Sequence, residues 1–347
     1  MSFNTTIGKH AFGPLMIDIE GTELSETERS WLADWRVGGV ILFTRNFDSR
    51  EQIANLVASI RTASESPLLI AIDHEGGRVQ RFRDGFSAIP PMRKLGELYD
   101  RSPAEAEQAA RILGGVLAAE LAAIDIDFSF TPVVDVDTGN SGVIGDRAFH
   151  GSPQIISRLA KSLMEGLHQA GMAAVAKHFP GHGFVAADSH LELPVDPRTL
   201  EAIREQDLLP FRELAEAGVE GVMPAHVVYE NIDPLPAGFS AFWIGRILRR
   251  ECGFDGAVFS DDLSMQGAVS MGSSLQRARL ALEAGCDMLL VCNDHSAVAE
   301  ILEGIDVQAD EQRTARLAKL QRRDSSGIST FRVSAAQGFA DTISALA

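Results

Sequence analysis

The segment 177–190, KHFPGHGFVAADSH, concentrates ionisable side chains that could do chemistry: Lys177, His178, His182, Asp188 and His190. An apolar run, GMAAVA (171–176), precedes it, and glycines and a proline interrupt the pattern directly afterwards. The run predicts a buried strand, and the residues after it predict a loop. In α/β folds, ligands bind and chemistry takes place just beyond the strand ends. We therefore expect a functional site here.

Asp188 and His190 stand two residues apart, so an extended backbone would place both side chains on one side. A carboxylate that orients an imidazole makes a general acid/base with a pKa of about 6.5, which suits neutral pH. The alternative is a hydrogen bond that only tethers the loop. That loop runs from Phe179 to about Pro197 and is long enough to move onto a substrate.

Asp261 and Asp262 follow a second apolar run, GAVFS (256–260). A carboxylate at that position can attack an electrophilic carbon or stabilise a cation. Either aspartate could instead cap the helix that follows, since Ser-Asp-Asp is good capping material. The spacing alone leaves both roles open.

Lys177 could form a Schiff base with a carbonyl substrate, or it could donate hydrogen bonds to a substrate hydroxyl. His178 would point to the opposite face if the strand continues, so at least one of the two side chains would serve packing. His178 and His182 have the spacing of zinc ligands on one helix face. Pro180 and the glycines beside it exclude a helix, so that argument for a metal site fails.

A further loop, DHEGGRVQRFRDGF (73–86), surrounds a glycine pair with acidic and basic residues. Neither GxGxxG nor GK[ST] is present, so the signal for phosphate binding is weak. We expect the loop to supply hydroxyl-binding groups, and Arg147 in GVIGDRAF to add another basic group. The charged residues of the loop include Asp73, Glu75, Arg78, Arg81 and Arg83.

Eight apolar, strand-like runs alternate with helical patterns along the chain. The runs cover 14–19, 38–43, 67–73, 126–134, 171–176, 220–225, 256–260 and 286–292, and the helical patterns lie near 25–36, 50–64, 104–124, 153–168, 198–216, 240–251, 274–284 and 295–304. Continuous apolar strands separated by helices indicate a parallel sheet covered on both faces. Eight such units predict a single-domain α/β fold, a (β/α)₈ TIM-type barrel over 1–305, with an open doubly wound sheet as the alternative. Residues 306–347 are expected to form a helical extension packed on the barrel.

The barrel prediction places the C-terminal ends of all eight strands at one mouth, where such folds build their active sites. Polar residues follow every run, among them Asp18, Glu20, Arg45, Asp73, Asp135, Lys177, His226, Asp261 and Asn293. Strands must end somewhere, but the concentration of carboxylates, histidines and basic groups exceeds what a boundary needs. The sequence therefore predicts an enzyme.

Composition narrows the class further. The net charge of −17 argues against nucleic acids and anionic membranes as partners. No run approaches the ~18 apolar residues of a membrane span, and the first residues lack the apolar core of a signal peptide. Three cysteines, odd in number and without metal-site spacing, fit a reducing cytoplasm.

Taken together, these motifs resemble glycoside hydrolase family 3, in particular its single-domain bacterial β-N-acetylglucosaminidases (β-hexosaminidases) of peptidoglycan recycling. The resemblance spans about 14 to 305. It rests on ILFTRN (41–46), AIDHEGGRVQRF (71–82), FTPVVDVD (130–137), IGDRAF (144–149), KHFPGHG (177–183), ADSH (187–190), MPAHVVY (223–229), GFDGAVFSDDLSM (253–265) and AGCDMLLVCN (284–293).

The resemblance implies a role for each matching residue. Asp261 matches the family's nucleophile, and His190 its acid/base, with Asp188 as partner. The positions that bind the sugar are Asp73, Arg81, Arg147, Lys177 and His178. No metal or cofactor is implied, and the expected partner is a small carbohydrate, GlcNAc linked to 1,6-anhydro-N-acetylmuramic acid with or without peptide, bound by a monomer.

The implied reaction is retaining removal of a terminal β-linked GlcNAc through a glycosyl-enzyme ester. Because a histidine acid/base leaves less negative charge near the acceptor, phosphate could replace water, which would make the chain a phosphorylase. A sugar-binding barrel without activity and a Schiff-base lyase that uses Lys177 also remain open.

Overall fold

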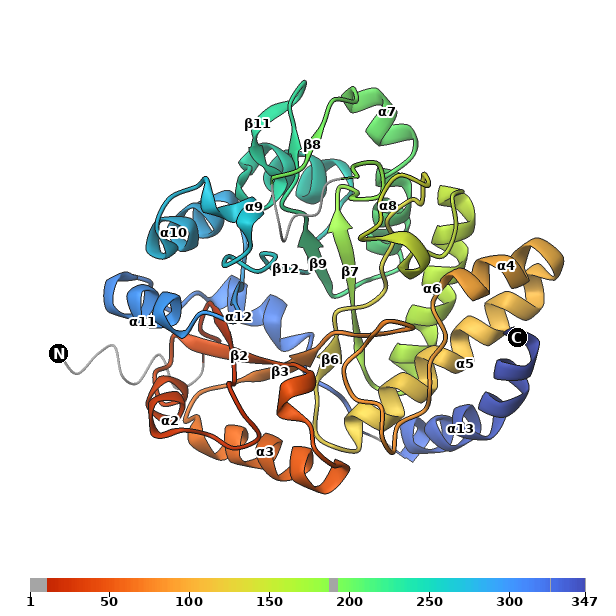
Figure 1. Cartoon of the computed structure of the whole chain (residues 1–347), viewed down its shortest axis with the longest axis horizontal. Coiled ribbons are helices and arrows are strands. Elements are labelled where there is room, and N and C mark those ends of the chain that lie inside the picture. Colours follow the sequence, from red (N-terminus) through yellow and green to blue (C-terminus); the bar gives the residue numbers. More distant parts are fainter. Residues whose placement is uncertain (1–10, 187–192, 325, 347) are drawn as a thin grey trace.

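A computed structural model of the chain describes residues 11–186, 193–324 and 326–346. Its centre is one sheet of eight parallel strands in the order β12–β9–β7–β6–β3–β2–β1–β13 (Figure 1). A parallel bridge between Phe259 and Met288 joins the two outer members, so the sheet closes on itself. The strands are β1 (Leu15–Asp18), β2 (Val37–Leu42), β3 (Leu69–Ile72), β6 (Phe128–Ser129), β7 (Ala173–Phe179), β9 (Gly221–Pro224), β12 (Ala257–Val258) and β13 (Leu289–Val291).

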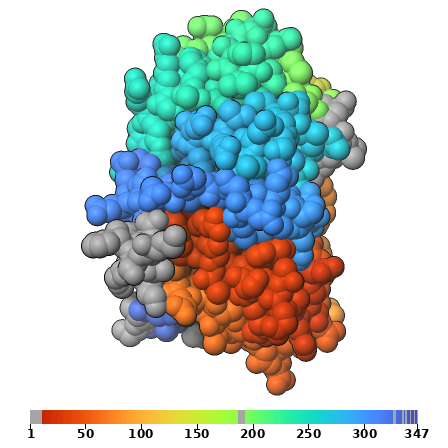
Figure 2. Space-filling view, turned by 90° about the vertical axis from the view of Figure 1, so that its left-hand side faces the viewer, coloured from red at the N-terminus to blue at the C-terminus, as the bar shows by residue number. Residues whose placement is uncertain are grey.

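Each of the eight apolar runs contains or overlaps one of these strands, which confirms the (β/α)₈ prediction and excludes the open sheet. Closure also shows on the surface: the C-terminal part of the barrel, in blue, lies directly against the N-terminal part, in red (Figure 2). All residues of β1, β2, β3 and β7 are buried. Burial on both faces explains why the runs are continuously apolar rather than alternating.

Helices surround the sheet, close to where the 3.6-residue patterns predicted them. They are α2 (Glu26–Leu32), α3 (Arg50–Ala63), α4 (Arg93–Arg101), α5 (Pro103–Ala122), α6 (Pro153–Gln169), α7 (Leu200–Glu205), α8 (Leu208–Glu216), η4 (Phe242–Glu251), α9 (Gln266–Val269), α10 (Ser274–Ala284) and α11 (His295–Gly304). Two differences stand out. The pattern at 198–216 forms two helices, and the one at 240–251 forms a π-helix.

Local sequence sets several helix ends. Ser25 and Ser273 begin α2 and α10 with capping boxes, in which the side chain of the third helical residue returns to the cap. Helix α10 ends at Gly285, whose φ of 113° favours a residue without a Cβ. These caps fix the residues at which α2 begins and at which α10 begins and ends.

Aromatic rings fill the barrel interior below the site. Phe128, Phe130 and Phe259 are fully buried, with the centroids of the rings of Phe128 and Phe130, and of Phe130 and Phe259, 5.1 Å apart. The Nζ atom of Lys177 lies 5.9 Å above the Phe130 ring. The packed core therefore ends at Phe130, and the polar site begins directly above it.

Shorter elements shape the mouth of the barrel. The hairpin of β4 (His74–Gly76) and β5 (Val79–Gln80) follows β3, and a small sheet joins β8 (Val195–Asp196), β10 (Val228–Tyr229) and β11 (Asp233–Pro236). The 3₁₀ turns η1 (Thr44–Asn46), η2 (Gly145–Arg147) and η3 (Ala237–Phe239) lie in the loops that follow β2, β6 and β11.

Beyond the eighth unit, the chain adds α12 (Glu311–Ala318) and α13 (Ser326–Leu346). Helix α13 lies along α5 (Figure 1). A Cβ on Gly115 of α5 would lie 2.8 Å from both Phe331 and Ala335, so the two helices approach closely. Among the described residues, no helix has the length and apolar character that crossing a membrane requires.

Candidate active site

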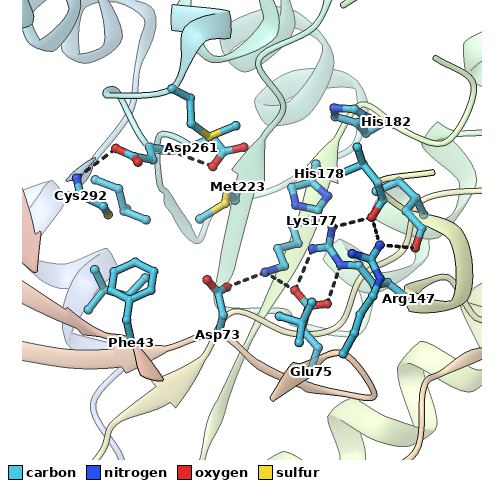
Figure 3. A pocket seen from close by; sticks show the side chains of 18 of the residues that line it. Phe43, Asp73, Glu75, Arg147, Lys177, His178, His182, Met223, Asp261 and Cys292 are labelled. Atoms are coloured by element: carbon cyan, nitrogen blue, oxygen red, sulfur yellow. Dashed lines mark hydrogen bonds and ion pairs between the residues drawn. The ribbon is translucent and has the colours of Figure 1, made fainter. Parts of the chain in front are cut away.

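A cavity of about 570 Å³ opens at the C-terminal ends of the strands (Figure 3). Side chains at or beyond the C-terminal ends of the second to the eighth strands line it. Among them are Phe43, Asp73, Glu75, Arg81, Arg147, Lys177, His178, His182, Asp261, Asp262, Cys292 and Asn293. All five predicted sugar-binding residues and Asp261 therefore meet in one pocket, although up to 188 positions separate them in the chain.

One wall of the pocket is a network of charged side chains, of which Glu75 and Lys177 are buried (Figure 3). Lys177 Nζ lies 2.8 Å from an Asp73 oxygen and 2.6 Å from Glu75 Oε1. Arg147 donates to both Glu75 oxygens at 2.8 Å. Arg81 donates to the second Asp73 oxygen at 3.1 Å. The two carboxylates thus hold three cations in fixed positions at the edge of the cavity.

The network keeps both carboxylates ionised. Burial opposes the charge of Asp73, but Lys177 and Arg81 outweigh it and hold the pKa of that carboxyl well below its ordinary value. Burial likewise opposes the charge of Glu75, yet Arg147 and Lys177 lower its pKa to about 2. The carboxylates can therefore accept hydrogen bonds from substrate hydroxyls throughout the neutral range.

A second buried pair orients His178. Its Nδ1 lies 2.7 Å from Asp135 Oδ2, and the backbone N–H of His182 donates to the other Asp135 oxygen at 2.7 Å. Burial opposes the charge of Asp135, but His178 and His182 lower its pKa. Since Asp135 occupies the Nδ1 side of the ring, the Nε2 side of His178 is the one that can face a ligand.

The expectation that Lys177 or His178 would turn away from the pocket is wrong, because both line it. The pairing of β7 with β9 shifts register between Lys177 and Phe179, which interrupts the simple alternation of side chains. The pairs that Lys177 makes also bear on its chemistry. Its Nζ lies 2.8 Å from an Asp73 oxygen and 2.6 Å from a Glu75 oxygen, so both carboxylates hold it in a hydrogen-bonding position. The geometry favours hydrogen bonding over a lyase.

Asp261 and Asp262 lie beyond β12 and line the cavity. Asp261 lies across it from the charged network (Figure 3). Neither caps a helix: α9 begins after Met265, and α10 after Ser273. The backbone N–H of Asp262 donates to Asp261 Oδ1 at 2.8 Å. The backbone N–H groups of Ser264 and Cys292 donate to Asp262 Oδ1 at 2.9 and 3.0 Å. The capping interpretation is therefore wrong.

The two aspartates are supported differently. His226, fully buried, lies with Nε2 3.0 Å from the carbonyl oxygen of Asp262 and stacks on Phe239. Burial, with a contribution from Asp261, raises the pKa of Asp262 to about 7. Asp262 thus links the end of β12 to Cys292 after β13 and, through His226, to Phe239 of η3. Asp261 lines the pocket beside it.

Sequence reasoning named Glu75, Asp135 and His226 as polar groups in the loop or at strand ends, without giving them a role. Only the fold shows that Glu75 joins Lys177 to Arg147 and that Asp135 orients His178. The predicted pair Asp188 and His190 lies outside the described residues. Over the parts of the chain that the structure describes, no three His, Cys, Asp or Glu side chains converge as metal ligands would.

Known proteins share both sequence and fold with this chain. The family description "Glycosyl hydrolase family 3 N terminal domain" matches residues 13–323. The curated protein "Beta-hexosaminidase" of Thiobacillus denitrificans is 54% identical over 308 residues, which cover 89% of this chain and 86% of that protein.

Solved structures agree with this match. The crystal structure of NagZ from Neisseria gonorrhoeae in complex with N-trifluoroacetyl-D-glucosamine superposes with a TM-score of 0.87 at 44% identity, covering 95% of this chain and 98% of the other. A second structure of that protein, in complex with zinc ion, gives 0.88 at 43% identity and covers 97% of each chain. On the match across 13–323 and these relatives, the chain belongs to glycosyl hydrolase family 3 and is a glycoside hydrolase of the β-hexosaminidase kind.

Proposed function

We propose that the chain is a retaining exo-β-N-acetylglucosaminidase with Asp261 as its nucleophile. The observation that carries this proposal is the position of Asp261: it lies at a strand end, across one cavity from the Asp73–Lys177–Glu75–Arg147 network (Figure 3). A sugar held by the network would present its anomeric carbon to the carboxylate. A carboxylate in reach of that carbon is what the first step of double displacement requires of the nucleophile.

The proposal of a sugar as substrate rests on the hydrogen-bond donors and acceptors of the network. Asp73 can accept hydrogen bonds from hydroxyls, and Lys177, Arg81 and Arg147 can donate them. Because these groups pair with one another, they are positioned before a sugar enters. Binding the sugar therefore costs less conformational entropy of these side chains. The relative solved in complex with N-trifluoroacetyl-D-glucosamine supports a GlcNAc-type sugar as the ligand.

The proposed chemistry combines Asp261 with Asp188 and His190, whose roles are those that the family resemblance implies. Asp261 attacks the anomeric carbon while His190, oriented by Asp188, protonates the departing oxygen, which leaves a glycosyl ester on Asp261. His190 then removes a proton from water, which attacks the same carbon and releases GlcNAc with its configuration retained. We propose muropeptides that end in GlcNAc on 1,6-anhydro-N-acetylmuramic acid, with or without peptide, as the substrates.

An aryl β-N-acetylglucosaminide tests the nucleophile. Wild type should release the aryl group, Asp261→Ala should lose at least about 10³-fold in kcat, and azide should restore part of the rate by giving the α-azide. Asp233→Ala, a change at an aspartate outside the pocket, is the control for a general effect of losing a carboxylate. Turnover by Asp261→Ala equal to wild type would remove Asp261 from this role.

Two additions to the same assay separate the alternatives. With phosphate present, a phosphorylase yields GlcNAc-1-phosphate, whereas a hydrolase yields GlcNAc alone. A chelator should leave turnover unchanged, and loss of activity to the chelator would make a metal part of the mechanism.

We further propose that the chain works as a monomer in the cytoplasm, with 1–305 as the catalytic barrel and 306–347 as an extension that covers α5. All three cysteines are buried and free, which suits a reducing compartment. Light scattering during size exclusion tests the monomer, and localisation of the tagged full chain in cell fractions tests the compartment.

A further inference from the structure

His226 is a buried polar side chain whose contacts place it beside the segment that carries Asp261. It follows the end of β9 by two residues, is fully buried and does not line the active-site cavity. Strand β9 pairs with β12, the strand that precedes Asp261 (Figure 1). A buried polar group costs folding free energy unless it is hydrogen-bonded, so its hydrogen bonds indicate what the residue does.

The surroundings of His226 fix which of its ring nitrogens carries the proton. Nε2 lies 3.0 Å from the carbonyl oxygen of Asp262, and a carbonyl oxygen can only accept a hydrogen bond. Nδ1 makes no hydrogen bond to the described residues, and a Cβ added to Gly238 would lie 3.6 Å from it. A second proton there would lack an acceptor, and burial lowers the pKa of His226. The imidazole is therefore a neutral donor with its proton on Nε2.

Phe239 holds this imidazole in place. The two rings are stacked, with their centroids 5.4 Å apart and 12° between their planes. Phe239 is itself buried in η3. Stacking fixes the plane of the His226 ring, and the hydrogen bond then decides which edge of the ring meets Asp262.

Asp262 connects this hydrogen bond to the proposed nucleophile. The backbone N–H of Asp262 donates to Asp261 Oδ1 at 2.8 Å, while the carbonyl of the same residue accepts from His226. The two groups lie on either side of one Cα, so together the hydrogen bonds fix the φ and ψ of Asp262. Without the His226 donor that carbonyl loses its side-chain partner, and a rotation of Asp262 toward another donor moves the N–H that holds Asp261.

The eighth strand holds the same segment from the other side. The backbone N–H of Ser260 donates to the Met288 carbonyl at 2.8 Å, and that of Leu263 donates to the Leu290 carbonyl at 2.9 Å. These bonds fix the path of the chain before and after the two aspartates. The hydrogen bond from His226 adds the orientation of the peptide group that follows Asp262.

We propose that His226 is a positioning residue of the reaction, which sets the orientation of the Asp261 carboxylate through the backbone of Asp262. The inference rests on the proposed function, since it requires Asp261 to be the nucleophile. His226 lies outside the cavity and contacts none of the sugar-binding residues named above, so its loss should affect the chemical step rather than sugar binding. A reacting group displaced by about 1 Å can cost about 10²-fold in rate.

The first test compares two amide variants in the release of an aryl group from an aryl β-N-acetylglucosaminide. His226→Gln places an amide nitrogen where Nε2 lies and keeps the donor, whereas the shorter His226→Asn places it where Nδ1 lies. His226→Asn should lower kcat by about 10- to 100-fold with KM within about twofold of wild type, and His226→Gln should recover most of that loss. Wild-type kcat in His226→Asn would overturn the inference, and so would equal losses in the two variants.

Azide separates an effect on Asp261 from general damage to the site. In Asp261→Ala, azide takes the place of the carboxylate as nucleophile, so the orientation of residue 261 no longer matters. Adding His226→Asn to Asp261→Ala should therefore leave the azide-rescued rate within about twofold. A fall as large as in the wild-type background would overturn the inference. Failure of the proposed function is a separate result, because Asp261→Ala would then match wild type without azide.

His168→Asn is the matched control. His168 Nε2 lies 2.9 Å from Glu220, the residue before β9, so this histidine is hydrogen-bonded at the opposite end of the same strand. Its loss should leave kcat within about twofold of wild type. A fall in His168→Asn equal to that in His226→Asn would overturn the inference.

Nuclear magnetic resonance of the wild-type protein gives a readout that does not depend on the activity of any variant. Two-bond ¹⁵N–¹H correlation at neutral pH should show His226 as the neutral tautomer with its proton on Nε2, and the signal is assigned by its absence from His226→Gln. A proton on Nδ1, in the other neutral tautomer or in the imidazolium, would overturn the inference.

Discussion

Replacing Glu75 with glutamine tests the idea that one buried carboxylate positions two cations of the site. Glu75 is 2% exposed, accepts two hydrogen bonds from Arg147 and forms an ion pair with Lys177 at 2.6 Å. Glutamine has nearly the same shape and keeps one acceptor oxygen. Its amide nitrogen must then face a donor of Arg147, so at least one charge-assisted hydrogen bond is lost.

The loss of one such bond costs about 1.5–3 kcal/mol. If the sugar depends on Arg147 and Lys177 in their present positions, kcat/KM should fall by about 10- to 150-fold. Lys177 keeps its pair with Asp73 at 2.8 Å, so the fold should survive the change. The fall should appear in KM when the two cations contact the sugar equally before and during the reaction.

The same substitution should alter stability in a pH-dependent way. The folded-state pKa of Glu75 is depressed from 4.5 to about 2, so its carboxylate stabilises the native state above the unfolded-state pKa. That contribution, about 3 kcal/mol at most, is lost as pH falls through the folded-state pKa. Wild type should therefore exceed Glu75→Gln in stability at pH 7, and the difference should shrink between pH 4.5 and 2.

Steady-state kinetics on the aryl substrate and urea unfolding at several pH values measure both effects. Glu230→Gln, the same change at an exposed glutamate outside the pocket, is the matched control. A Glu75→Gln enzyme within twofold of wild type in kcat/KM, with a pH-independent stability difference, would refute the positioning role.

Three further changes probe other parts of the site and its frame. Asp135→Asn places an amide against His178 Nδ1 and should lower kcat/KM by about tenfold or more; activity equal to wild type would show that His178 needs no such partner. Burial raises the pKa of Asp262 from 3.8 to about 7, so between these values the native carboxyl keeps its proton while the unfolded one ionises, and stability falls as pH rises. Asp262→Asn should thus gain stability relative to wild type from pH 4 to pH 8 in thermal unfolding, and a constant difference would contradict the burial argument. A Cβ on Gly114 of α5 would lie 2.2 Å from the Leu163 carbonyl oxygen of α6, so Gly114→Ala should destabilise the fold by about 1–3 kcal/mol; equal urea midpoints for Gly114→Ala and wild type would show that the two helices can separate without cost.

The sequence alone predicts the barrel architecture and places the site at the C-terminal ends of the strands. Eight apolar runs predicted eight buried strands because a parallel sheet covered on both faces needs apolar residues at every position. The helix starts at Ser25 and Ser273 follow from caps that depend only on neighbouring residues. Polar residues beyond the strand ends, from Asp18 to Asn293, could be assigned to one mouth before any contact was known.

Predictions from local sequence patterns were wrong where groups distant in the chain interact with the same backbone or side-chain atoms. Strand alternation predicted that Lys177 and His178 would diverge, but a register shift against β9 brings both into the pocket. Capping chemistry offered Asp261 or Asp262 as a helix cap, whereas neither caps a helix and backbone N–H groups of Ser264 and Cys292 hold the Asp262 carboxylate instead. The π-helix at Phe242–Glu251 carries no local signal that distinguishes it from an ordinary helix.

The tertiary structure alone decided the partnerships. Glu75 pairs with Arg147, 72 positions away, and Lys177 pairs with Asp73 across 104 positions. Asp18 accepts the backbone N–H of Asn293 across 275 positions. Sequence fixes which residues stand at strand ends, because burial and periodicity are local properties of the chain. Barrel closure decides which strand ends become neighbours and which charges then interact. Only closure sets the distances on which electrostatic and hydrogen-bond energies depend.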